Sequence, residues 1–483
     1  MSSRLLLGID LGTTNSKALV VEESGRIVSS GSSPVSVSFG TGGKAEQDIE
    51  EIWKAALSAV AQAVAGVDAS EVAAVGISSQ GGAIQVLDAA GRPVGPVVGW
   101  QDSRGNPWDD ELTRRLGSDW FVRRTGYSQS AGAIGQVLRM RDQGTLRKDS
   151  FIAFVGDIVV GRLCGARAHD QTSLSEPCLL NPGLGAADPE LLSILGLEEE
   201  SLPPVLPVNR PAGGLLPDVA RALGLPGGIP VGPAVHDQYA AAVGSGTVRP
   251  ADTMLGVGTA WVLLAVADRM APPIGGVALV GRHPVPGLFG QMLSMVNGGS
   301  TLSWVTRTFS LGDPGVADID EILLSVPSGS DGLRFRPLLA GKGGGGLPPG
   351  TRGRLEGLRL DHTPAHFLRA AVEGLACELG RHLLMMEDGG VPVSRIVMCG
   401  KAAASRVTPQ VVADTTGLTV DCSTLAETGS LGAAVLARSL LEPGADLAGL
   451  ADAMKPPMSR VLPGPDAGQA RQRRDQYVAA LRP

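Results

Sequence analysis

The sequence has few cysteines, few aromatic residues and no long hydrophobic run. Its five cysteines are an odd number and none forms a Cys-x-x-Cys pair, which argues against a disulfide framework or a zinc site. No apolar run approaches the roughly 18 residues that a membrane span needs. The opening RLLLGID is too short for the apolar part of a signal peptide. We therefore expect buried thiols, a cytoplasmic location and no membrane contact.

A basic excess is also missing. The net charge is -7, and the only dense basic cluster is a short RQRR near the C-terminus, so we expect no nucleic-acid partner. Glycine, in contrast, is abundant at 67 residues, which indicates many tight turns and close backbone approaches. A length of 483 residues with 43% hydrophobic content predicts two or three domains with large cores.

The N-terminal pattern predicts a mixed α/β fold. Apolar runs at 5–9 and 18–21 flank a Gly/Thr loop, which is typical of a β-hairpin. Apolar residues at helical spacing predict a helix over 48–65, and a short buried strand is expected at 72–78. Antiparallel strands followed by a helix and a further strand indicate a mixed sheet flanked by helices.

A similar pattern appears again in the second half. The apolar runs 251–257 and 261–265 flank Gly258 and Thr259, so we interpret this segment as an internal duplication of the first hairpin. A long helix is expected from 364 to 386, followed by a strand at 395–398. A short polar helix over 467–481 closes the chain. The stretch GKGGGGLPPG (341–350) lacks the GxxxxGK[ST] order and predicts a flexible surface loop rather than a phosphate-binding P-loop.

The stretch GIDLGTTNSKA, at residues 8–18, carries the first candidate chemistry. Asp10 stands at a strand end, where a carboxylate suits Mg²⁺. Thr13, Thr14 and Asn15 offer donors in sequence for phosphate oxygens, and Lys17 could add a positive charge. The alternative interpretation is a polar hairpin turn whose aspartate is satisfied by backbone amides. The residues alone leave both interpretations open.

This stretch resembles the first phosphate motif of the actin-like ATPase superfamily, which includes sugar kinases, actin and the large heat-shock chaperones. Later stretches are similar to the FGGY family of carbohydrate kinases. They include AEQDIEEIW, VGISSQGGAIQVLDAAGRPVGPVVGWQDSRG, GPAVHDQYAAAVGSG and GLRLDHTPAHFLRAAVEGLACEL. The resemblance extends over about 5–437, and the chaperones lack the Trp-Gln-Asp-Ser-Arg and His-Asp-Gln segments.

The resemblance implies an α/β fold of two actin-like (ribonuclease H-like) domains, each with a mixed five-stranded sheet flanked by helices, and a cleft between them. We expect the N-terminal domain at 1–244 and the C-terminal domain at 245–483, with the last helix a candidate to pack back on the N-terminal domain. ATP and Mg²⁺ are the implied cofactors, and Asp10 is the implied metal ligand. Asp237 is the implied general base; its alternative role is to cap the helix that follows.

The substrate residues indicated by the pattern and the resemblance are Gln80, Gly81, Trp100, Asp102, Arg104 and Gln238. Trp100, Asp102 and Arg104 alternate, so in an extended segment their side chains would share one face. The alternative is an ion pair between Asp102 and Arg104 beside a core tryptophan. Glycerol kinases show an Arg-Glu pair, and xylulokinases a Met-His pair, where this chain has Gly81 and Gly82. We expect these two glycines to leave room for a larger or differently oriented substrate.

Several residues are implied to bind the nucleotide. Thr13, Thr14, Asn15 and Lys17 would form the first phosphate loop, and Gly258 and Thr259 the second, with an ordinary hairpin as the alternative. The remaining nucleotide residues are Gly400, Lys401 and Ser405. The family usually shows consecutive glycines at this adenosine loop, so GKAAAS leaves the nucleotide preference open.

The predicted function is ATP-dependent phosphorylation of a sugar or polyol hydroxyl, with a ketopentose such as xylulose as the leading substrate. Glycerol, erythritol, gluconate and ribulose are the alternative substrates. A nucleotide-driven switch and a non-catalytic sugar sensor are the alternatives of another class. A homodimer is compatible with the resemblance, but the sequence gives no oligomeric state.

Overall fold

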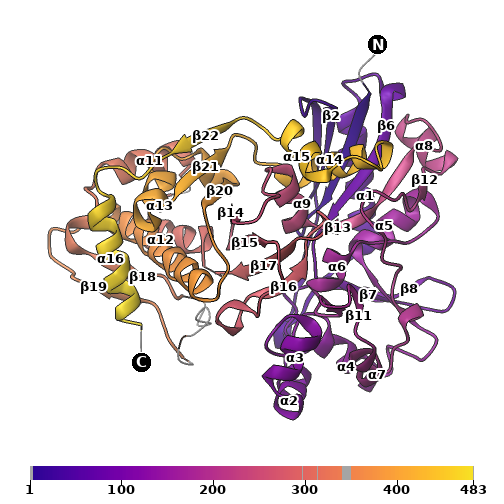
Figure 1. Cartoon of the computed structure of the whole chain (residues 1–483), viewed down its shortest axis with the longest axis horizontal. Helices are drawn as coiled ribbons and strands as arrows, with labels where there is room; N and C mark the ends of the chain where they lie inside the picture. The colour runs from indigo at the N-terminus through magenta and orange to yellow at the C-terminus, as the bar shows by residue number, and fades with distance from the viewer. Residues whose placement is uncertain (1–3, 296, 313, 340–346, 348–349, 482–483) are drawn as a thin grey trace.

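Two mixed sheets form the centre of the computed structural model, which describes residues 4–295, 297–312, 314–339, 347 and 350–481 (Figure 1). Most of the GKGGGGLPPG stretch therefore lies outside the described residues. The first sheet has the order β3-β2-β1-β6-β13-β12. Its strands are β1 (Leu5–Leu11), β2 (Asn15–Glu22), β3 (Ile27–Pro34), β6 (Val72–Ser79), β12 (Gly213–Gly214) and β13 (Pro230–His236).

The second sheet has the order β16-β17-β15-β14-β20-β21-β22. Its strands are β14 (Asp252–Val257), β15 (Trp261–Ala267), β16 (Leu279–Arg282), β17 (Phe289–Ser294), β20 (Arg395–Cys399), β21 (Thr419–Ser423) and β22 (Met458–Val461). In each sheet a hairpin strand lies antiparallel to its partner and parallel to the next strand inward, as β1 does with β2 and β6, and β14 with β15 and β20. The predicted duplication is confirmed. Each main sheet has more than the five predicted strands, because edge strands are added to it.

The remaining strands of the described chain form three smaller sheets. A five-stranded sheet has the order β4-β5-β8-β7-β9, with β4 (Ser38–Phe39), β5 (Ala45–Gln47), β7 (Ile84–Leu87), β8 (Pro93–Val98) and β9 (Phe151–Phe154). Two-stranded pairs join β10 (Leu180–Asn181) to β11 (Ala186–Ala187), and β18 (Arg334–Arg336) to β19 (Arg354–Glu356). These additions lie outside the duplicated cores.

Helices cover both faces of each main sheet. The first domain contains α1 (Ile49–Val64), α2 (Asn106–Leu116), α3 (Ser118–Thr125), α4 (Ile134–Asp142), α5 (Val155–Cys164), α6 (Gln171–Ser175), α7 (Pro189–Leu195), α8 (Pro217–Leu223) and α9 (Asp237–Gly244). The later helices are α10 (Gly299–Thr308), α11 (Val316–Leu324), α12 (Pro364–Asp388), α13 (Thr408–Thr416), α14 (Thr428–Leu441), α15 (Leu447–Met454) and α16 (Ala467–Ala479). The helices predicted at 48–65 and 364–386 are confirmed as α1 and α12.

A shared core joins the two main sheets. Leu6 and Val235 of the first sheet and Leu264 and Val397 of the second belong to one buried apolar cluster, which also contains side chains of α9, α14 and α15. Thus α9 and α14 lie between the sheets, and the shared cluster ties the two domains together.

Glycines allow this close packing of α14. A Cβ at Gly8 of β1 would lie 2.0 Å from the Ser430 carbonyl oxygen, and one at Gly76 of β6 would lie 1.9 Å from that of Ala433. Where α9 meets α14, a Cβ at Gly432 would lie 1.8 Å from the Ala240 carbonyl oxygen. These distances are far inside van der Waals contact, so any larger residue would push the elements apart.

Gly432→Ala should therefore destabilise the protein. Inserting one methyl group into this tight contact should lower the free energy of unfolding by about 1–3 kcal/mol. Urea-induced unfolding followed by circular dichroism would measure it. Gly468→Ala in α16 is the matched control, because a Cβ there meets nothing within 4 Å and should be neutral or slightly stabilising. Equal stability of the two variants would contradict the packing argument.

The last helix does not pack on the N-terminal domain as the sequence suggested. Helix α16 lies on α12 and α13, far from the first sheet (Figure 1). Tyr477 donates a hydrogen bond to Glu378 Oε2 (2.9 Å), and Arg474 donates to the Thr415 carbonyl. The helix that returns to the first sheet is α14, because its apolar side chains and the glycines opposite them match that sheet.

All five cysteines are buried and free, as expected. Among the described helices, none combines the length and the apolar character that crossing a membrane requires.

Candidate active site

Three adjacent parallel strands end at one edge of the first sheet. Asp10 of β1 lies opposite Ser78 of β6, which lies opposite Val235 of β13. Ser78 Oγ donates to Asp10 Oδ1 at 2.7 Å. Asp237 follows β13 directly, so both predicted acidic residues lie at the carboxyl ends of strands, where open α/β sheets bind ligands.

Asp237 begins helix α9, and its side chain is 31% exposed. The N-cap residue of this helix is His236, so Asp237 is not the capping residue. Burial raises the pKa of Asp237 to about 6, against the lowering effect of hydrogen bonds from the Gln238 backbone and side chain. This carboxylate is partly accessible and has an elevated proton affinity, as a general base requires.

Asp10 is in a strongly acidic environment. Burial and the negative charge of Asp237 raise its pKa to about 6, while the Ser78 hydrogen bond and the charge of Lys17 oppose the increase. Lys17 Nζ lies 3.8 Å from Glu427 Oε1, and the negative charge of Glu427 offsets part of the positive charge of Lys17. Two carboxylates that repel each other at a partly open edge are what a divalent cation would stabilise.

The surroundings of Asp10 suit a hydrated Mg²⁺ ion. A Cβ at Gly429 of α14 would lie 3.3 Å from the Asp10 carboxyl carbon, so the glycine keeps that side of the carboxylate free of a side chain. No cluster of three or more metal-binding side chains occurs in the part of the chain described. Mg²⁺ commonly takes one or two carboxylates and keeps several waters, so this donor set fits it.

The first Gly/Thr turn contains residues with different roles. The side chain of Thr14 is exposed at its tip and accepts a bond from Asn15 Nδ2 at 3.3 Å. The Thr13 hydroxyl instead donates to Gln80 Oε1 and accepts from Trp100 Nε1, both at 3.0 Å. Thr13 therefore connects the turn to the predicted substrate residues, while Thr14 remains open to a ligand.

A second glutamine completes this connection. Gln47 of β5 donates to the Thr13 carbonyl at 2.9 Å and accepts from Gln80 Nε2 at 3.0 Å. Gln47 and Gln80 are both buried, whereas Trp100 is 53% exposed. The sequence pattern did not identify Gln47, although this residue lies within AEQDIEEIW. The network holds the first Gly/Thr turn and the loop at Gln80 in a fixed relation.

Asp102 is enclosed in the protein. Its side chain is fully buried, and it accepts hydrogen bonds from the Ala45 backbone, from Arg104 and from Gln136. Arg104 also pairs with Glu46 at 2.7 Å. The ion pair weighed as the alternative is present, and no carboxylate oxygen of Asp102 is left for a ligand.

The room expected at Gly81 and Gly82 is filled by other side chains of the chain. A Cβ at Gly81 would lie 2.3 Å from Cδ2 of His236, and one at Gly82 would lie 2.4 Å from Oε2 of Glu176. Gly82 also has a φ of +66°, which favours glycine. The expectation that the glycines leave open space is wrong, because His236 and Glu176 fill it.

His236 and Glu176 are site residues that the sequence did not reveal. His236 Nε2 lies 3.5 Å from Asp237 Oδ1, and burial lowers the pKa of His236 to about 4, so its ring is neutral. Burial and the charge of Asp237 raise the pKa of Glu176 to about 7. His236 had a signal, since it precedes Asp237. Glu176 had none, because its contact with Gly82 joins distant parts of the chain.

The second Gly/Thr turn belongs to the C-terminal domain. The carbonyls of Gly258 and Thr259 accept from the backbone N–H groups of Gly299 and Ser300, each at 3.0 Å, and the Thr259 side chain is exposed. Gln238 lies at the boundary between the two domains, because its Oε1 is 3.5 Å from a Cβ placed at Gly256 of β14.

In the predicted adenosine loop, the Lys401 side chain is exposed and the Ser405 side chain is hydrogen-bonded within the protein. Gly400 follows β20 with a φ of +104°, a conformation that requires glycine, and Lys401 is exposed. Ser405 is buried and donates to Asp320, and it accepts from the Thr408 backbone N–H at 2.9 Å. Ser405 therefore fixes the start of α13, and its hydroxyl is not directed to a ligand.

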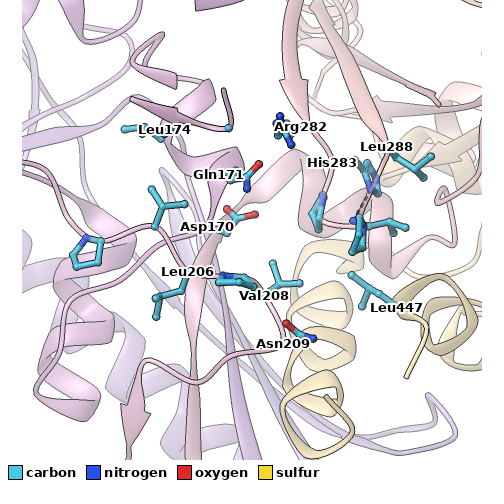
Figure 2. A pocket seen from close by; sticks show the side chains of 18 of the residues that line it. Asp170, Gln171, Leu174, Leu206, Val208, Asn209, Arg282, His283, Leu288 and Leu447 are labelled. Atoms are coloured by element: carbon cyan, nitrogen blue, oxygen red, sulfur yellow. Dashed lines mark hydrogen bonds between the residues drawn. The ribbon is translucent and has the colours of Figure 1, made fainter. Parts of the chain in front are cut away.

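A cavity of about 950 Å³ lies elsewhere between the domains, and neither Asp10 nor Asp237 lines it. Figure 2 shows Asp170, Gln171 and Leu206 on one side of it, and Arg282, His283 and Leu288 on the other. Its wall is mostly apolar and rich in proline. Both domains contribute residues to the wall.

A duplicated α/β fold, with two Gly/Thr turns and acidic strand ends at the interface, defines a phosphotransferase of the actin-like class. Residues 5–244 match the N-terminal domain of the FGGY family of carbohydrate kinases, and residues 254–440 match its C-terminal domain. The chain belongs to the FGGY family of carbohydrate kinases, and it is a carbohydrate kinase.

Individual relatives carry several substrate names. The glycerol kinase of Symbiobacterium thermophilum is 31% identical over 460 residues, covering 90% of each chain. The structure of xylulose kinase from Rhodospirillum rubrum superposes with a TM-score of 0.87 at 25% identity, covering 99% of this chain and 98% of that one. The glycerol kinase of Plasmodium falciparum, solved with ADP, has a TM-score of 0.87 at 18% identity, covering 99% of this chain and 97% of that one.

Proposed function

We propose that the protein transfers the γ-phosphoryl group of ATP to a hydroxyl of a sugar or polyol, with a ketopentose such as xylulose as the leading substrate. One observation carries this proposal: a partly exposed carboxylate, Asp237, stands at the strand ends beside a second carboxylate, Asp10. The two Gly/Thr turns, one in each domain, support phosphate binding from opposite sides. Closure of the two domains over the substrates would exclude water from the site.

Asp237 takes the proton from the attacking hydroxyl. Its elevated pKa makes it a stronger base than an exposed aspartate, and it remains mostly ionised at neutral pH. Asp10 would hold Mg²⁺, largely through water, and the ion would supply charge neutralisation at the phosphates. Thr14 and Thr259, exposed at the tips of the two turns, donate to phosphate oxygens.

The fixed network around Gln80 positions the sugar. Trp100 offers an exposed aromatic face, and its ring nitrogen is held by Thr13. An aromatic face beside ordered amide groups suits a polyhydroxylated ligand, since the C–H side of the sugar contacts the ring and the hydroxyls meet the amides. Asp102 and Arg104 pair with each other, and Arg104 also pairs with Glu46, so we do not count them among the ligand-binding residues.

These features reduce the number of candidate substrates but do not select one. The Arg-Glu pair of glycerol kinases and the Met-His pair of xylulokinases are both absent from this loop. Purified protein should be incubated with ATP and Mg²⁺ and with each of a panel of ketopentoses, ketohexoses, pentitols, gluconate and glycerol, and ADP release should be measured. We expect slow ADP release without sugar and strong stimulation by at least one member. ATPase that is equally fast with and without sugar would contradict transfer and favour a nucleotide-driven switch.

The rate should depend on pH through Asp237. Since burial raises its pKa to about 6, kcat/KM for the sugar should fall below that pH, by about tenfold per unit at the acid end. The base must be ionised to accept the proton, so activity is lost as the pH decreases. A profile measured from pH 4.5 to 8.5, at constant ionic strength and saturating ATP, tests this. A flat acid side would contradict a titrating base at this position.

A further inference from the structure

Gly81 and Gly82 of the substrate loop have no side chains, and side chains from another part of the chain occupy the space beside them. Gly81 and Gly82 present bare backbone, and the volume above them holds the ends of His236 and Glu176. Glu176 comes directly after α6. This helix is fixed to β13, because His236 N–H donates to Thr172 Oγ1 at 3.0 Å and Ser173 Oγ donates to the Ala234 carbonyl at 3.1 Å. Glu176 is therefore held beside the loop by a rigid support.

The carboxylate of Glu176 is not satisfied within the described structure. Its Oε2 atom is buried and has no hydrogen-bond partner, although the residue as a whole is partly exposed. The neighbouring His236 Nδ1 is likewise buried without a partner. A buried acceptor without a donor is costly, more so when it is charged. A ligand hydroxyl that donated to Glu176 would remove that cost.

The position of Glu176 relates it to the reaction. Glu176 Cγ and His236 Nε2 lie 2.9 Å and 2.5 Å from a Cβ placed at Gly81, and His236 Nε2 lies 3.5 Å from Asp237 Oδ1, so Glu176 lies near the proposed base. Asp10 adds a third negative charge at the same edge, and Lys17 is the basic group that acts on Asp10. The substrate end of the site is therefore acidic.

We propose that Glu176 is the specificity-determining residue of this kinase: its carboxylate accepts a hydrogen bond from a second hydroxyl of the bound substrate and repels sugar acids. This inference rests on the proposed function and narrows it to neutral polyols and ketoses. Gluconate, whose carboxylate would approach this acidic edge, is excluded.

Two variants and one control test the proposal. Glu176→Gln keeps the shape and one acceptor oxygen but removes the charge, and Glu176→Met keeps the approximate length but removes both acceptors. The control Glu200→Gln removes an exposed carboxylate outside the site. Each protein is assayed for ADP release with the best neutral substrate of the panel and with gluconate.

The expected result is a change in KM that exceeds the change in kcat. Glu176→Met should raise KM for the neutral substrate about 10- to 100-fold, which corresponds to one hydrogen bond to a charged group. Glu176→Gln should raise the kcat/KM of gluconate relative to the neutral substrate by about tenfold. Glu200→Gln should change neither value.

The outcomes separate the two levels of the proposal. If the wild-type protein shows no stimulation by any sugar, the proposed function fails and the inference fails with it. If the wild type is active but both Glu176 variants keep its KM and its preference, the inference alone is wrong. If Glu176→Met fails to fold, as judged by its thermal unfolding, Glu176→Gln decides by the same comparison.

Discussion

Asp237→Asn should reduce sugar-dependent ADP release by about 10²- to 10⁴-fold, the usual contribution of a positioned general base. Asparagine has the same shape as aspartate but cannot accept the proton of the attacking hydroxyl. Because Asp237 stands at the start of α9 on the sugar side of the site, ATP affinity should remain close to that of the wild type. Stopped-time assays of sugar phosphate and calorimetric titration with ATP would measure both quantities.

Asp218→Asn is a matched control for this experiment. Asp218 also lies in the first turn of a helix, α8, but its side chain is 90% exposed and remote from the strand ends. It should leave the rate unchanged. If Asp237→Asn kept wild-type transfer, Asp237 could not be the base. If neither the wild type nor the variant transferred phosphate, yet both bound sugar, a sugar sensor would be the better description.

Asp10→Asn should lower kcat by about 10²-fold or more, because charge stabilisation by a metal ion contributes several kcal/mol to phosphoryl transfer. The amide removes the negative charge that would hold Mg²⁺ and that now repels Asp237. The concentration of Mg²⁺ needed for half-maximal rate should increase. Binding of ATP, titrated with and without Mg²⁺, gives a readout that does not depend on turnover.

Ser78→Ala is the milder control for Asp10. It removes the 2.7 Å hydrogen bond to Asp10 but leaves the carboxylate in place, so its effect on the rate should be much smaller. An unchanged Mg²⁺ requirement in Asp10→Asn would contradict the assignment of this residue to the metal.

The fold could be predicted largely because its signals are local. The strand–turn–strand pattern at residues 5–21 reappears at 251–265, and β-hairpins form between neighbours in sequence, so the duplication is visible without long-range information. The carboxylates at the ends of β1 and β13 could be predicted for the same reason. Edge strands such as β12 and β22 are short, and their pairing depends on distant partners.

The directions of two predicted site side chains depend on the local backbone, which the sequence did not show. Alternation along 100–104 places Trp100 and Asp102 on one face only if the segment is extended. Strand β8 ends at Val98, and Asp102 N–H donates to the Gly99 carbonyl, so the chain turns. Trp100 is consequently exposed while Asp102 is buried. Ser405 precedes α13, and its hydroxyl donates to Asp320 and accepts from the Thr408 backbone N–H.

The glycine pair illustrates a different limit. From the sequence, Gly81 and Gly82 suggest open space. In the structure that space is filled by Glu176, which follows α6, and by His236 at the end of β13. No local pattern connects Glu176 to Gly82. Only the packing of α6 on β13 brings the acidic side chain to the loop, and this packing is a property of the complete fold.

The central claim is that Asp237 removes the proton of a polyol bound between the domains. A crystal structure with the best neutral substrate and a non-hydrolysable ATP analogue tests it most directly. The account predicts an Asp237 carboxylate oxygen at about 2.6–3.2 Å from one substrate hydroxyl, with that hydroxyl facing the γ-phosphorus. A substrate bound elsewhere, or no hydroxyl within reach of Asp237 in the closed complex, would contradict it.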